Sequence, residues 1–299
     1  MDFKQLRSLV AVIEYGSFTT AAEKLRISQP TVSTHIRTLE EELGTPLVLR
    51  STKRVELTAS GYKMYDQAVS LLSMHDRMLQ NMRRRESNVV YLGASSIPSG
   101  YILPKILAEF CETHPDTSFV ISQDSSQGVI DSMLAGVYDL GFVGMPVKED
   151  TLEAVPFCDD RIVLVTANSE RFQAIDGNDA EAIKNLLTSE HIIMRKTGSA
   201  TRATGSHILE GLGIEEADLN IVAHLDDLEA IKNLVEQGLG ISLMSEYAVR
   251  NRVASGWLRA FDIPGVDTFR RFYVVSRKNV ELGGKTDELH RFVQQRGQR

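Results

Sequence analysis

A run of polar side chains between residues 28 and 37 best suits hydrogen-bonding chemistry by type and spacing. Hydroxyl, amide and guanidinium groups can bond to base edges in the major groove or to phosphate oxygens. The apolar residues of the same stretch recur at helical spacing, so a helix would turn the polar groups to the opposite side. These apolar residues are Val32, Ile36, Leu39 and Leu43. The candidate nucleic-acid contacts are Ser28, Gln29, Pro30, Thr31, Ser33, Thr34 and Arg37. A helical hairpin with a polar face toward solvent would show the same pattern.

Two helices separated by a very short break are expected to position that face. Ser17 is placed to cap the first helix, since its oxygen can accept an otherwise unpaired backbone N–H. Ser28 is placed to cap the second, with Pro30 in the first turn and Gly44 at the end. The pair is therefore predicted to be a helix-turn-helix. An earlier helix is expected to complete the core with the stripe Phe3, Leu6, Leu9, Val10 and Ile13.

Residues 47–58, LVLRSTKRVELT, alternate in polarity on both sides of a turn and predict two short strands. Arg50, Lys53 and Arg54 cluster at the turn, where they could reach a phosphate or the minor groove. Because this hairpin directly follows the candidate recognition helix, it is predicted to be the wing of a winged helix. A basic surface hairpin without that role would have the same features.

One long helix is predicted from Thr58, a suitable cap, to about Glu86. Its apolar stripe extends beyond what the small preceding domain needs, so the same helix of a second subunit is the simplest partner. Arg83, Arg84 and Arg85 lie in the last turn, where they complement the negative end of the helix dipole. The stripe consists of Met64, Ala68, Leu71, Leu72, Met78, Leu79 and Met82.

Composition indicates a globular protein and argues against a membrane partner. The hydrophobic fraction is 42%, and no apolar run is long enough to span a bilayer. Residues 1–88 carry 13 basic and 10 acidic side chains, whereas the remainder carries 20 and 30. This asymmetry suits a small module that meets phosphate, attached to a larger one that does not. Without a signal-peptide core, and with Cys111 and Cys158 far apart, the chain is expected in the reducing cytoplasm.

Residues 89–299 alternate strand and helix patterns, which predicts an α/β fold. The run over 89–144 favours a parallel sheet with right-handed crossovers. A further strand is expected at 161–167, a second α/β unit over 191–245, and a strand at 270–278 before the terminal helix. Two strand-to-helix turns, 94–100 and 195–202, are rich in hydroxyls, and ligands of such folds bind at turns of this kind. Side chains that only cap the following helices would give the same composition.

The first 88 residues resemble the DNA-binding domain and linker helix of the LysR-type transcriptional regulators. The resemblance is carried by FKQLRSLVAVIEYGSFTTAAEKLRISQPTVSTHIRTLEEELGTPLVLRS followed by VELTASG. It implies a winged helix-turn-helix over residues 1–58, a linker and dimerisation helix over 59–88, and a two-lobed effector-binding domain over 89–299. That domain would be α/β and similar to periplasmic solute-binding proteins. Lobe I would comprise 89–160 and 267–299, and lobe II 165–265.

The resemblance also implies the partners: operator or promoter DNA as a duplex, a small-molecule effector, further copies in a homodimer or homotetramer, and RNA polymerase. It makes the two hydroxyl-rich turns the effector-contacting loops. The candidate effector contacts are Ser95, Ser96, Ser99, Thr197, Ser199 and Thr201. Their composition leans toward the branch that senses sulfur compounds or small oxyanions. Asp226 and Asp227, at another turn expected to face the cleft, would oppose an anion unless Asp227 is only a helix cap.

A ligand-responsive transcription regulator accounts for all of these features together. A solute-binding transport protein would explain only residues 89–299 and would need an export signal. An enzyme would need convergent titratable groups, and the sequence has no nucleophile elbow, phosphate-binding loop or zinc-like histidine pair. The sequence therefore predicts a regulator with no catalytic residue, metal or cofactor. Its effector stays open, with a small anion or sulfur-related metabolite as the leading class.

Overall fold

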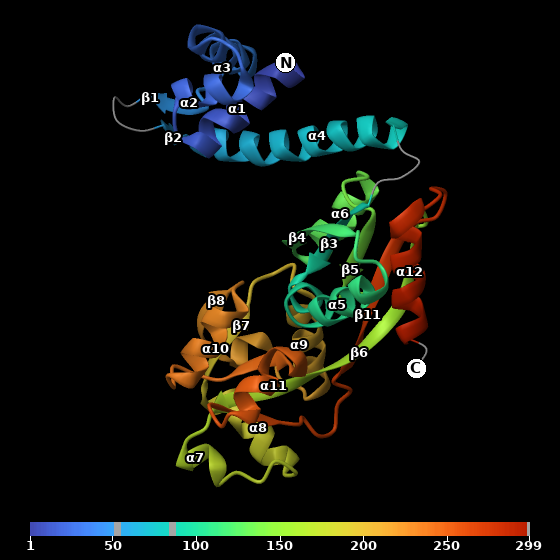
Figure 1. Ribbon diagram of the computed structural model, residues 1–299. Helices are drawn as coiled ribbons and strands as arrows, with labels where there is room; N and C mark the ends of the chain where they lie inside the picture. Colours follow the sequence, from blue (N-terminus) through green and yellow to red (C-terminus); the bar gives the residue numbers. More distant parts are fainter. Residues whose placement is uncertain (51–54, 84–87, 298–299) are drawn as a thin grey trace. The chain divides into compact units, whose positions relative to one another are not determined.

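The computed structural model describes residues 1–50, 55–83 and 88–297, and the chain divides into two compact units (Figure 1). These are Met1–Arg84 and Arg85–Arg299. None of the described helices is long and apolar enough to cross a membrane. Lys53 and Arg54, predicted at the wing tip, and Arg84 and Arg85, predicted in the last turn of the long helix, lie outside the described residues.

Three helices form the core of the first unit: α1 (Phe3–Tyr15), α2 (Phe18–Leu25) and α3 (Gln29–Leu43). Their ends follow the predicted local signals. Ser17 Oγ accepts the N–H of Thr20, and Ser28 Oγ accepts the N–H of Thr31. Gly44 ends α3 at φ +64°, in the left-handed region that favours glycine. Both helices of the predicted helix-turn-helix are therefore present.

The three helices enclose an apolar core. Its fully buried members include Leu6, Leu9, Val12, Ala21, Ala22, Val32, Ile36 and Leu39. The predicted stripes were wrong at their ends, since Phe3 is 45% and Leu43 is 43% exposed. Both lie in a terminal turn of their helix, and Phe3 stays partly exposed although its ring meets the His75 ring of α4, with centroids 4.3 Å apart.

A short hairpin follows α3. β1 (Val48–Arg50) pairs antiparallel with β2 (Val55–Leu57), which confirms the predicted strand pair. The Glu40 carboxylate on α3 accepts the backbone N–H of Leu47 at 2.8 Å and of Val48 at 3.1 Å. These bonds tie the first strand to the C-terminal half of α3, so the hairpin is held beside that helix.

The long helix α4 (Ala59–Arg83) packs one side of its first half on the core of its own domain. Thr58 begins it by accepting the N–H of Gly61 at 2.9 Å. Ala68 is fully buried, and Met64 and Leu72 are partly buried against the same core. The stripe expected to be left uncovered is thus partly covered within the chain, because α1 lies along α4. The expectation that this whole stripe needs a second subunit to cover it was therefore wrong for the first half of α4.

Other apolar side chains of α4 stay open within the first unit. Tyr62 is 63% and Leu71 is 39% exposed. The side chains of Met78, Leu79 and Met82 lie outside those that the structure describes. An uncovered apolar surface therefore exists on α4, although it is smaller than the sequence pattern suggested.

The second unit is organised around a seven-stranded sheet in the order β10-β6-β11-β5-β3-β4, with β9 also pairing with β6. β3 is parallel to both β4 and β5, as predicted. The sheet is nevertheless mixed, because β6 runs antiparallel to β9, β10 and β11. The strands are β3 (Val89–Ser95), β4 (Ser118–Asp124), β5 (Leu140–Val143), β6 (Leu152–Ala167), β9 (Ser242–Ser245), β10 (Leu258–Phe261) and β11 (Phe269–Arg277).

Two long strands connect two lobes of this unit, as Figure 1 shows. We call the part around β3, β4 and β5 lobe I. The part around β7 (His191–Arg195), β8 (Asn220–Leu225), β9 and β10 is called lobe II. The first half of β6 pairs with β11, and its second half pairs with β9 and β10. A strand was predicted only at 161–167, the apolar half of β6, whereas the other half, whose burial is irregular, was not predicted. β11 also pairs with β5, so the chain returns to lobe I near its C-terminus.

Lobe II contains a parallel pair, β7 (His191–Arg195) and β8 (Asn220–Leu225), with helices around it. Each of these strands precedes the helix predicted after it. The elements that were not predicted include α7, α8, α11 and β10. In α11 only Ala248 and Val249 are buried, so the sequence carries no apolar stripe. The helices of the second unit are α5 (Leu103–Thr113), α6 (Ser126–Leu134), α7 (Glu170–Gln173), α8 (Ala180–Ser189), α9 (Ala200–Gly211), α10 (Leu228–Glu236), α11 (Glu246–Ala254) and α12 (Gly284–Gly297), with a π-helical turn at Pro98–Ile102 and a 3-10 turn at Glu216–Asp218.

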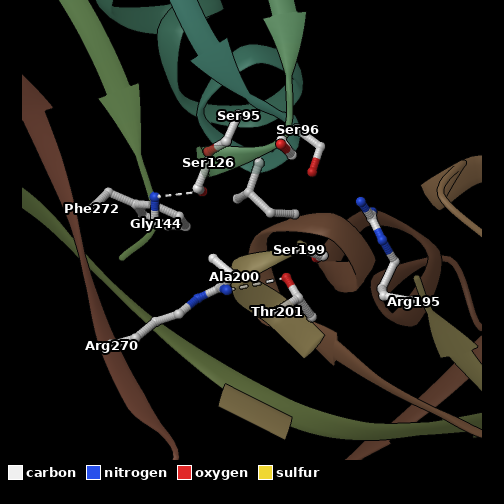
Figure 2. Close-up of a pocket in the computed structure, with 12 residues that line it drawn as sticks. Ser95, Ser96, Ser126, Gly144, Arg195, Ser199, Ala200, Thr201, Arg270 and Phe272 are labelled. Carbon is white, nitrogen blue, oxygen red and sulfur yellow. Dashed lines mark hydrogen bonds between the residues drawn. The ribbon is translucent and has the colours of Figure 1, made fainter. Parts of the chain in front are cut away.

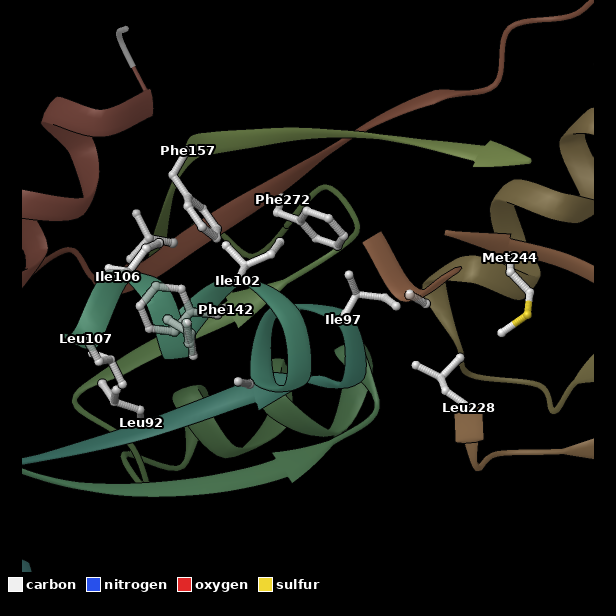
Figure 3. Close-up of a cluster of buried hydrophobic side chains, with 14 of the residues drawn as sticks. Leu92, Ile97, Ile102, Ile106, Leu107, Phe142, Phe157, Leu228, Met244 and Phe272 are labelled. Atoms are coloured by element: carbon white, nitrogen blue, oxygen red, sulfur yellow. The ribbon is translucent and has the colours of Figure 1, made fainter. Parts of the chain in front are cut away.

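One cluster of buried apolar side chains extends through both lobes (Figure 3). In lobe I the rings of Phe142 and Phe157 meet edge to face, with their centroids 5.6 Å apart. Leu228 and Met244 of lobe II belong to the same cluster. Because the cluster is contiguous, the two lobes share part of their hydrophobic core.

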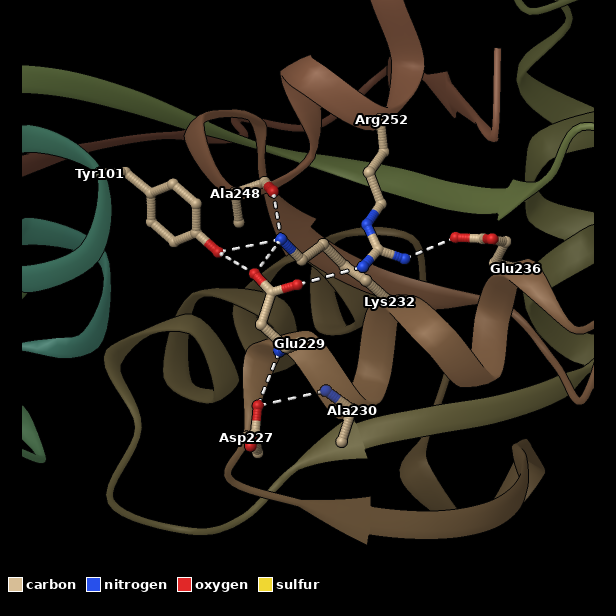
Figure 4. Close-up of polar contacts among 8 residues, drawn as sticks. All are labelled: Tyr101, Asp227, Glu229, Ala230, Lys232, Glu236, Ala248 and Arg252. Atoms are coloured by element: carbon tan, nitrogen blue, oxygen red, sulfur yellow. Dashed lines mark hydrogen bonds and ion pairs between the residues drawn. The ribbon is translucent and has the colours of Figure 1, made fainter. Parts of the chain in front are cut away.

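A polar network also joins the lobes (Figure 4). Lys232 on α10 is only 4% exposed. Its ammonium group donates to Tyr101 Oη at 3.0 Å, Glu229 Oε1 at 2.5 Å and the carbonyl of Ala248 at 3.1 Å. Tyr101 comes from the π-helical turn of lobe I, and its hydroxyl donates to Glu229 Oε1 at 3.1 Å. All three donors of the buried lysine are therefore used, one of them across the lobes.

Candidate functional site

The predicted polar face of α3 is open to solvent. Ser28, Gln29, Pro30, Thr34 and Arg37 are exposed, and Thr31 and Ser33 are half-buried. The apolar residues of α3 that enter the core lie on the opposite side. Ser28 Oγ lies 2.7 Å from Thr31 Oγ1 and 3.3 Å from its backbone nitrogen, which stabilises the first turn. A rigid helix with one polar, uncovered face can present hydrogen-bonding groups to a groove of DNA.

Two charged or titratable side chains of α3, Arg37 and His35, differ in whether contacts within the domain hold them in place. Arg37 pairs with Glu41 at 3.5 Å, but both are about two-thirds exposed, so the pair contributes little. His35 lies with Nδ1 2.7 Å from Oγ of the buried Ser8 on α1. A buried hydroxyl needs a partner, so His35 is better explained as a link between helices. Arg37 stays free to turn toward a phosphate.

The wing can be described only in part. Arg50 ends β1 opposite Val55, and its side chain is outside those described, as are Lys53 and Arg54. Their role in contacting DNA stays a prediction.

A small cavity lies in the second unit and is lined from both lobes (Figure 2). Four of the six predicted hydroxyl residues line it. These are Ser95 and Ser96 at the end of β3, and Ser199 and Thr201 at the start of α9. Ser99 and Thr197 are not among the lining residues, and Thr197 is exposed. The two turns predicted from their composition therefore meet at one cavity, although two of their six predicted hydroxyl residues do not line it.

The alternative reading, that such hydroxyls only cap helices, applies to some of the lining residues. Ser125, which was not predicted, caps α6 by accepting the N–H of Gly128 at 3.0 Å. Its neighbour Ser126 accepts the N–H of Gly144 at 3.3 Å. Ser199 precedes α9 but makes no side-chain cap bond. Capping therefore explains Ser125 and does not explain Ser199.

Two buried arginines, which the sequence analysis missed, also line the cavity. Arg270 on β11 forms an ion pair with Asp160 on β6, with Nε and Nη2 2.8 and 2.7 Å from Oδ2. Its Nη1 donates to Thr201 Oγ1 at 3.1 Å, and Asp160 Oδ1 accepts from Ser245 at 2.9 Å. Burial lowers the pKa of Arg270, and the charge of Asp160 opposes that shift. The charge of Arg270 is thus compensated within the protein.

The second arginine, Arg195, is the last residue of β7 and is only 9% exposed. Its Nε and Nη1 are buried and have no hydrogen-bond partner among the described residues. Burial lowers its pKa, while the charge of Asp226 acts in the opposite direction. A charged residue ending an otherwise apolar strand, HIIMR, was the signal that could have identified it.

The acidic pair near the cleft does not occupy the cavity. Asp227 caps α10, accepting the N–H groups of Glu229 at 2.7 Å and Ala230 at 3.1 Å. Asp226 pairs with Lys196 at 3.3 Å, and both side chains are about 60% exposed. Neither aspartate is among the lining residues. The objection to an anionic ligand raised by this pair is therefore weakened.

No group of three or more His, Cys, Asp or Glu that could hold a metal ion occurs within residues 1–50, 55–83 and 88–297.

Family models match nearly the whole chain. "Bacterial regulatory helix-turn-helix protein, lysR family" matches residues 3–62, and "LysR substrate binding domain" matches residues 83–298. A probable RuBisCO transcriptional regulator of Nostoc is 28% identical over 281 residues, covering 92% of this chain and 82% of the relative. An uncharacterized HTH-type transcriptional regulator of Bacillus subtilis, YwqM, is 30% identical over 263 residues and 87% of each chain.

Solved structures with the same fold include a full-length regulator, CbnR, complexed with its target DNA. It is 20% identical, has a TM-score of 0.71, and the match covers 99% of this chain and all of CbnR. The regulatory domain of CcmR from Synechocystis, in complex with 2-PG, has a TM-score of 0.61 at 23% identity, over 69% of this chain and 96% of that domain. At these identities the likeness establishes the fold.

Proposed function

The chain belongs to the LysR family of bacterial helix-turn-helix regulators, and we propose that a small molecule in its cavity controls its binding to operator DNA. The family matches confirm the predicted family, the helix-turn-helix followed by a two-lobed α/β domain, and the function as a transcriptional regulator. The observation that carries the proposal is the coexistence of an open polar helix face and a polar cavity lined from two lobes.

The proposed DNA contacts are the residues of the exposed face of α3. Gln29 and Thr34 are exposed in its N-terminal half, where a recognition helix meets base edges. Arg37 is available for a phosphate. The full set proposed is Ser28, Gln29, Pro30, Thr31, Ser33, Thr34 and Arg37, with Arg50, Lys53 and Arg54 of the wing as phosphate contacts.

The proposed effector site is the cavity, with Ser95 and Ser96 of lobe I and Ser199 and Thr201 of lobe II as contacts. A ligand held from both lobes binds best when the lobes are close together, so it shifts the population toward that form. It can alter DNA binding only by this difference in affinity, typically about 1–3 kcal/mol. Ser99 and Thr197, which do not line the cavity, are left as weaker candidates.

We propose α4 as the subunit contact of a homodimer that associates further to a tetramer. The exposed Leu71 and Tyr62 supply apolar surface for it. The corresponding division of the chain is residues 1–58 for DNA, 59–88 for the linker and 89–299 for the effector. A regulator of transcription works beside the chromosome and RNA polymerase, so the cytoplasm is the proposed location.

DNA selection from a random pool, with the full-length protein, tests the DNA-binding part. Gln29→Ala should relax the preference at one base position per half-site, since a bidentate contact discriminates by about 1–3 kcal/mol. Gln127→Ala changes an exposed glutamine of the second unit and serves as the matched control. A Gln29→Ala protein that selects the same sequence as the wild type would show that α3 does not read bases through this residue.

A further inference from the structure

Within the part of the chain that the structure describes, no acidic side chain forms an ion pair with the buried Arg195. It is 9% exposed, and its Nε and Nη1 have no hydrogen-bond partner among the described residues. The other arginine of the cavity, Arg270, is held by Asp160 and Thr201. A guanidinium group removed from water without a partner is strongly unfavourable, and buried polar groups almost always have one. The arrangement is expected where a ligand supplies the missing partner.

The acidic side chains near Arg195 are engaged elsewhere. Asp226 pairs with Lys196, and Asp227 accepts two backbone N–H groups at the start of α10. Asp160, completely buried, is paired with Arg270. The pair of Arg270 and Asp160 has no net charge, so the lining of the cavity carries one uncompensated positive charge, that of Arg195.

Other groups beside Arg195 are also suited to an anion. Ser199 directly precedes α9 and its side chain makes no cap bond, so the first N–H groups of this helix are not capped by that residue. Free N–H groups and the positive end of the helix dipole attract negative charge. Figure 2 shows Ser199 and Thr201 between the two arginines, with Ser95 and Ser96 across from them. Ile97 and Phe272 add apolar surface.

We propose that this cavity binds a small, singly charged carboxylate with a hydroxyl-bearing body. The carboxylate accepts hydrogen bonds from Arg195 and from the first turn of α9, and the hydroxyls meet Ser95 and Ser96. The planar guanidinium group matches a carboxylate well, and one net positive charge matches one negative charge. The small size of the cavity limits the ligand to a small molecule. This inference rests on the proposed function, since it specifies the effector of the same site.

Isothermal calorimetry on the full-length protein without DNA tests the proposal. The probes are acetate, glycolate, lactate, glycerate and gluconate, each hydroxy acid being paired with its neutral amide, and inorganic phosphate and sulfate. One or more hydroxy acids should bind, their amides should not, and phosphate and sulfate should bind more weakly. The proposal is overturned if an amide binds as well as its acid, if only phosphate or sulfate binds, or if none of the carboxylates binds.

Variants assign the binding to one side chain. Arg195→Gln should weaken binding of the best acid by roughly 10- to 100-fold, the usual effect of losing a charged hydrogen bond. Arg195→Lys should retain part of the affinity. Lys196→Gln removes the adjacent, exposed charge, which does not line the cavity, and should leave the affinity unchanged. Equal losses in Arg195→Gln and Lys196→Gln would mean a diffuse electrostatic effect and would overturn the proposal. If Arg195→Gln does not fold, the comparison of each acid with its amide in the wild type still tests whether the cavity requires a negative charge on the ligand.

Operator binding separates this inference from the proposed function. An acid that binds through Arg195 without changing operator affinity supports the ligand class and contradicts the proposed switch. A neutral compound that changes operator affinity equally in the wild type and Arg195→Gln contradicts the ligand class and supports the switch.

Discussion

Replacing Lys232 by Met should destabilise the effector domain, because the lysine is a buried junction between the lobes. The ammonium group is lost together with bonds to Tyr101, Glu229 and the carbonyl of the buried Ala248 (Figure 4). Met has nearly the same length, so packing changes little. The effect then depends on what happens to the three groups that lose their partner.

Those groups differ in their exposure to water. Glu229 is 58% exposed and still pairs with Arg252 at 3.1 Å, so it does not become a stranded buried charge. The Ala248 carbonyl is buried, and leaving it unpaired costs about 1–3 kcal/mol. Relief of the desolvation of the lysine offsets part of this. We therefore expect a loss of about 1–3 kcal/mol, below the ~3–5 kcal/mol of a fully buried broken pair.

Tyr101→Phe removes only the hydroxyl and keeps the ring. Lys232 retains two partners, so the loss should be smaller, about 1 kcal/mol. Because this hydroxyl supplies the contact from lobe I, its removal should also weaken ligand binding severalfold by favouring separated lobes.

Urea unfolding measured by fluorescence of Trp257 gives the free energies of unfolding. This is the single tryptophan of the chain and lies in lobe II, just after α11. Lys105→Met, which changes an exposed lysine of α5, is the matched control and should be neutral. The reasoning is refuted if Lys232→Met is as stable as the wild type, or if Tyr101→Phe destabilises more than Lys232→Met.

Two further predictions concern pH and assembly. Burial lowers the pKa of His290, so the unfolded state takes up its proton first as pH falls below about 6.5 and stability is lost. His290→Gln should reduce the loss of stability between about pH 7 and pH 5 in urea titrations, and the exposed His207→Gln should not. Leu71→Glu should shift the protein toward monomers with lower operator affinity in sedimentation and DNA-binding assays, because one helix-turn-helix holds only a half-site. Leu239→Glu, similarly exposed in the second unit, is its control, and an unchanged mass of Leu71→Glu would contradict α4 as the contact.

The sequence by itself determined the first unit and most elements of the second. The ends of α2 and α3 depend on Ser17, Ser28 and Gly44, whose capping bonds and backbone angles span only a few residues. The spacing of apolar residues that marks helices and strands also repeats within a few residues, so it can be recognised in the sequence without knowledge of the fold. The two hydroxyl-rich turns could also be predicted from the sequence, because each joins a strand to a helix within a short stretch.

The elements that the sequence did not determine depend on distant neighbours. α11 has a weak pattern because only two of its residues are buried, and the first half of β6 becomes a strand by pairing with β11. Leu72 was read as part of an open stripe, yet it packs on the core of its own domain. In each case burial is set by an element elsewhere in the chain, which a local pattern does not contain.

The charge of the cavity was decided only by the tertiary structure. Arg270 and Asp160 are 110 residues apart in the chain and become partners because β6 and β11 are adjacent. Arg195 has the same formal charge as Arg270 in the sequence, but the fold buries it beside groups that are already paired. Whether a charged residue is compensated depends on the contacts that surround it in space, and only the folded chain brings those contacts together.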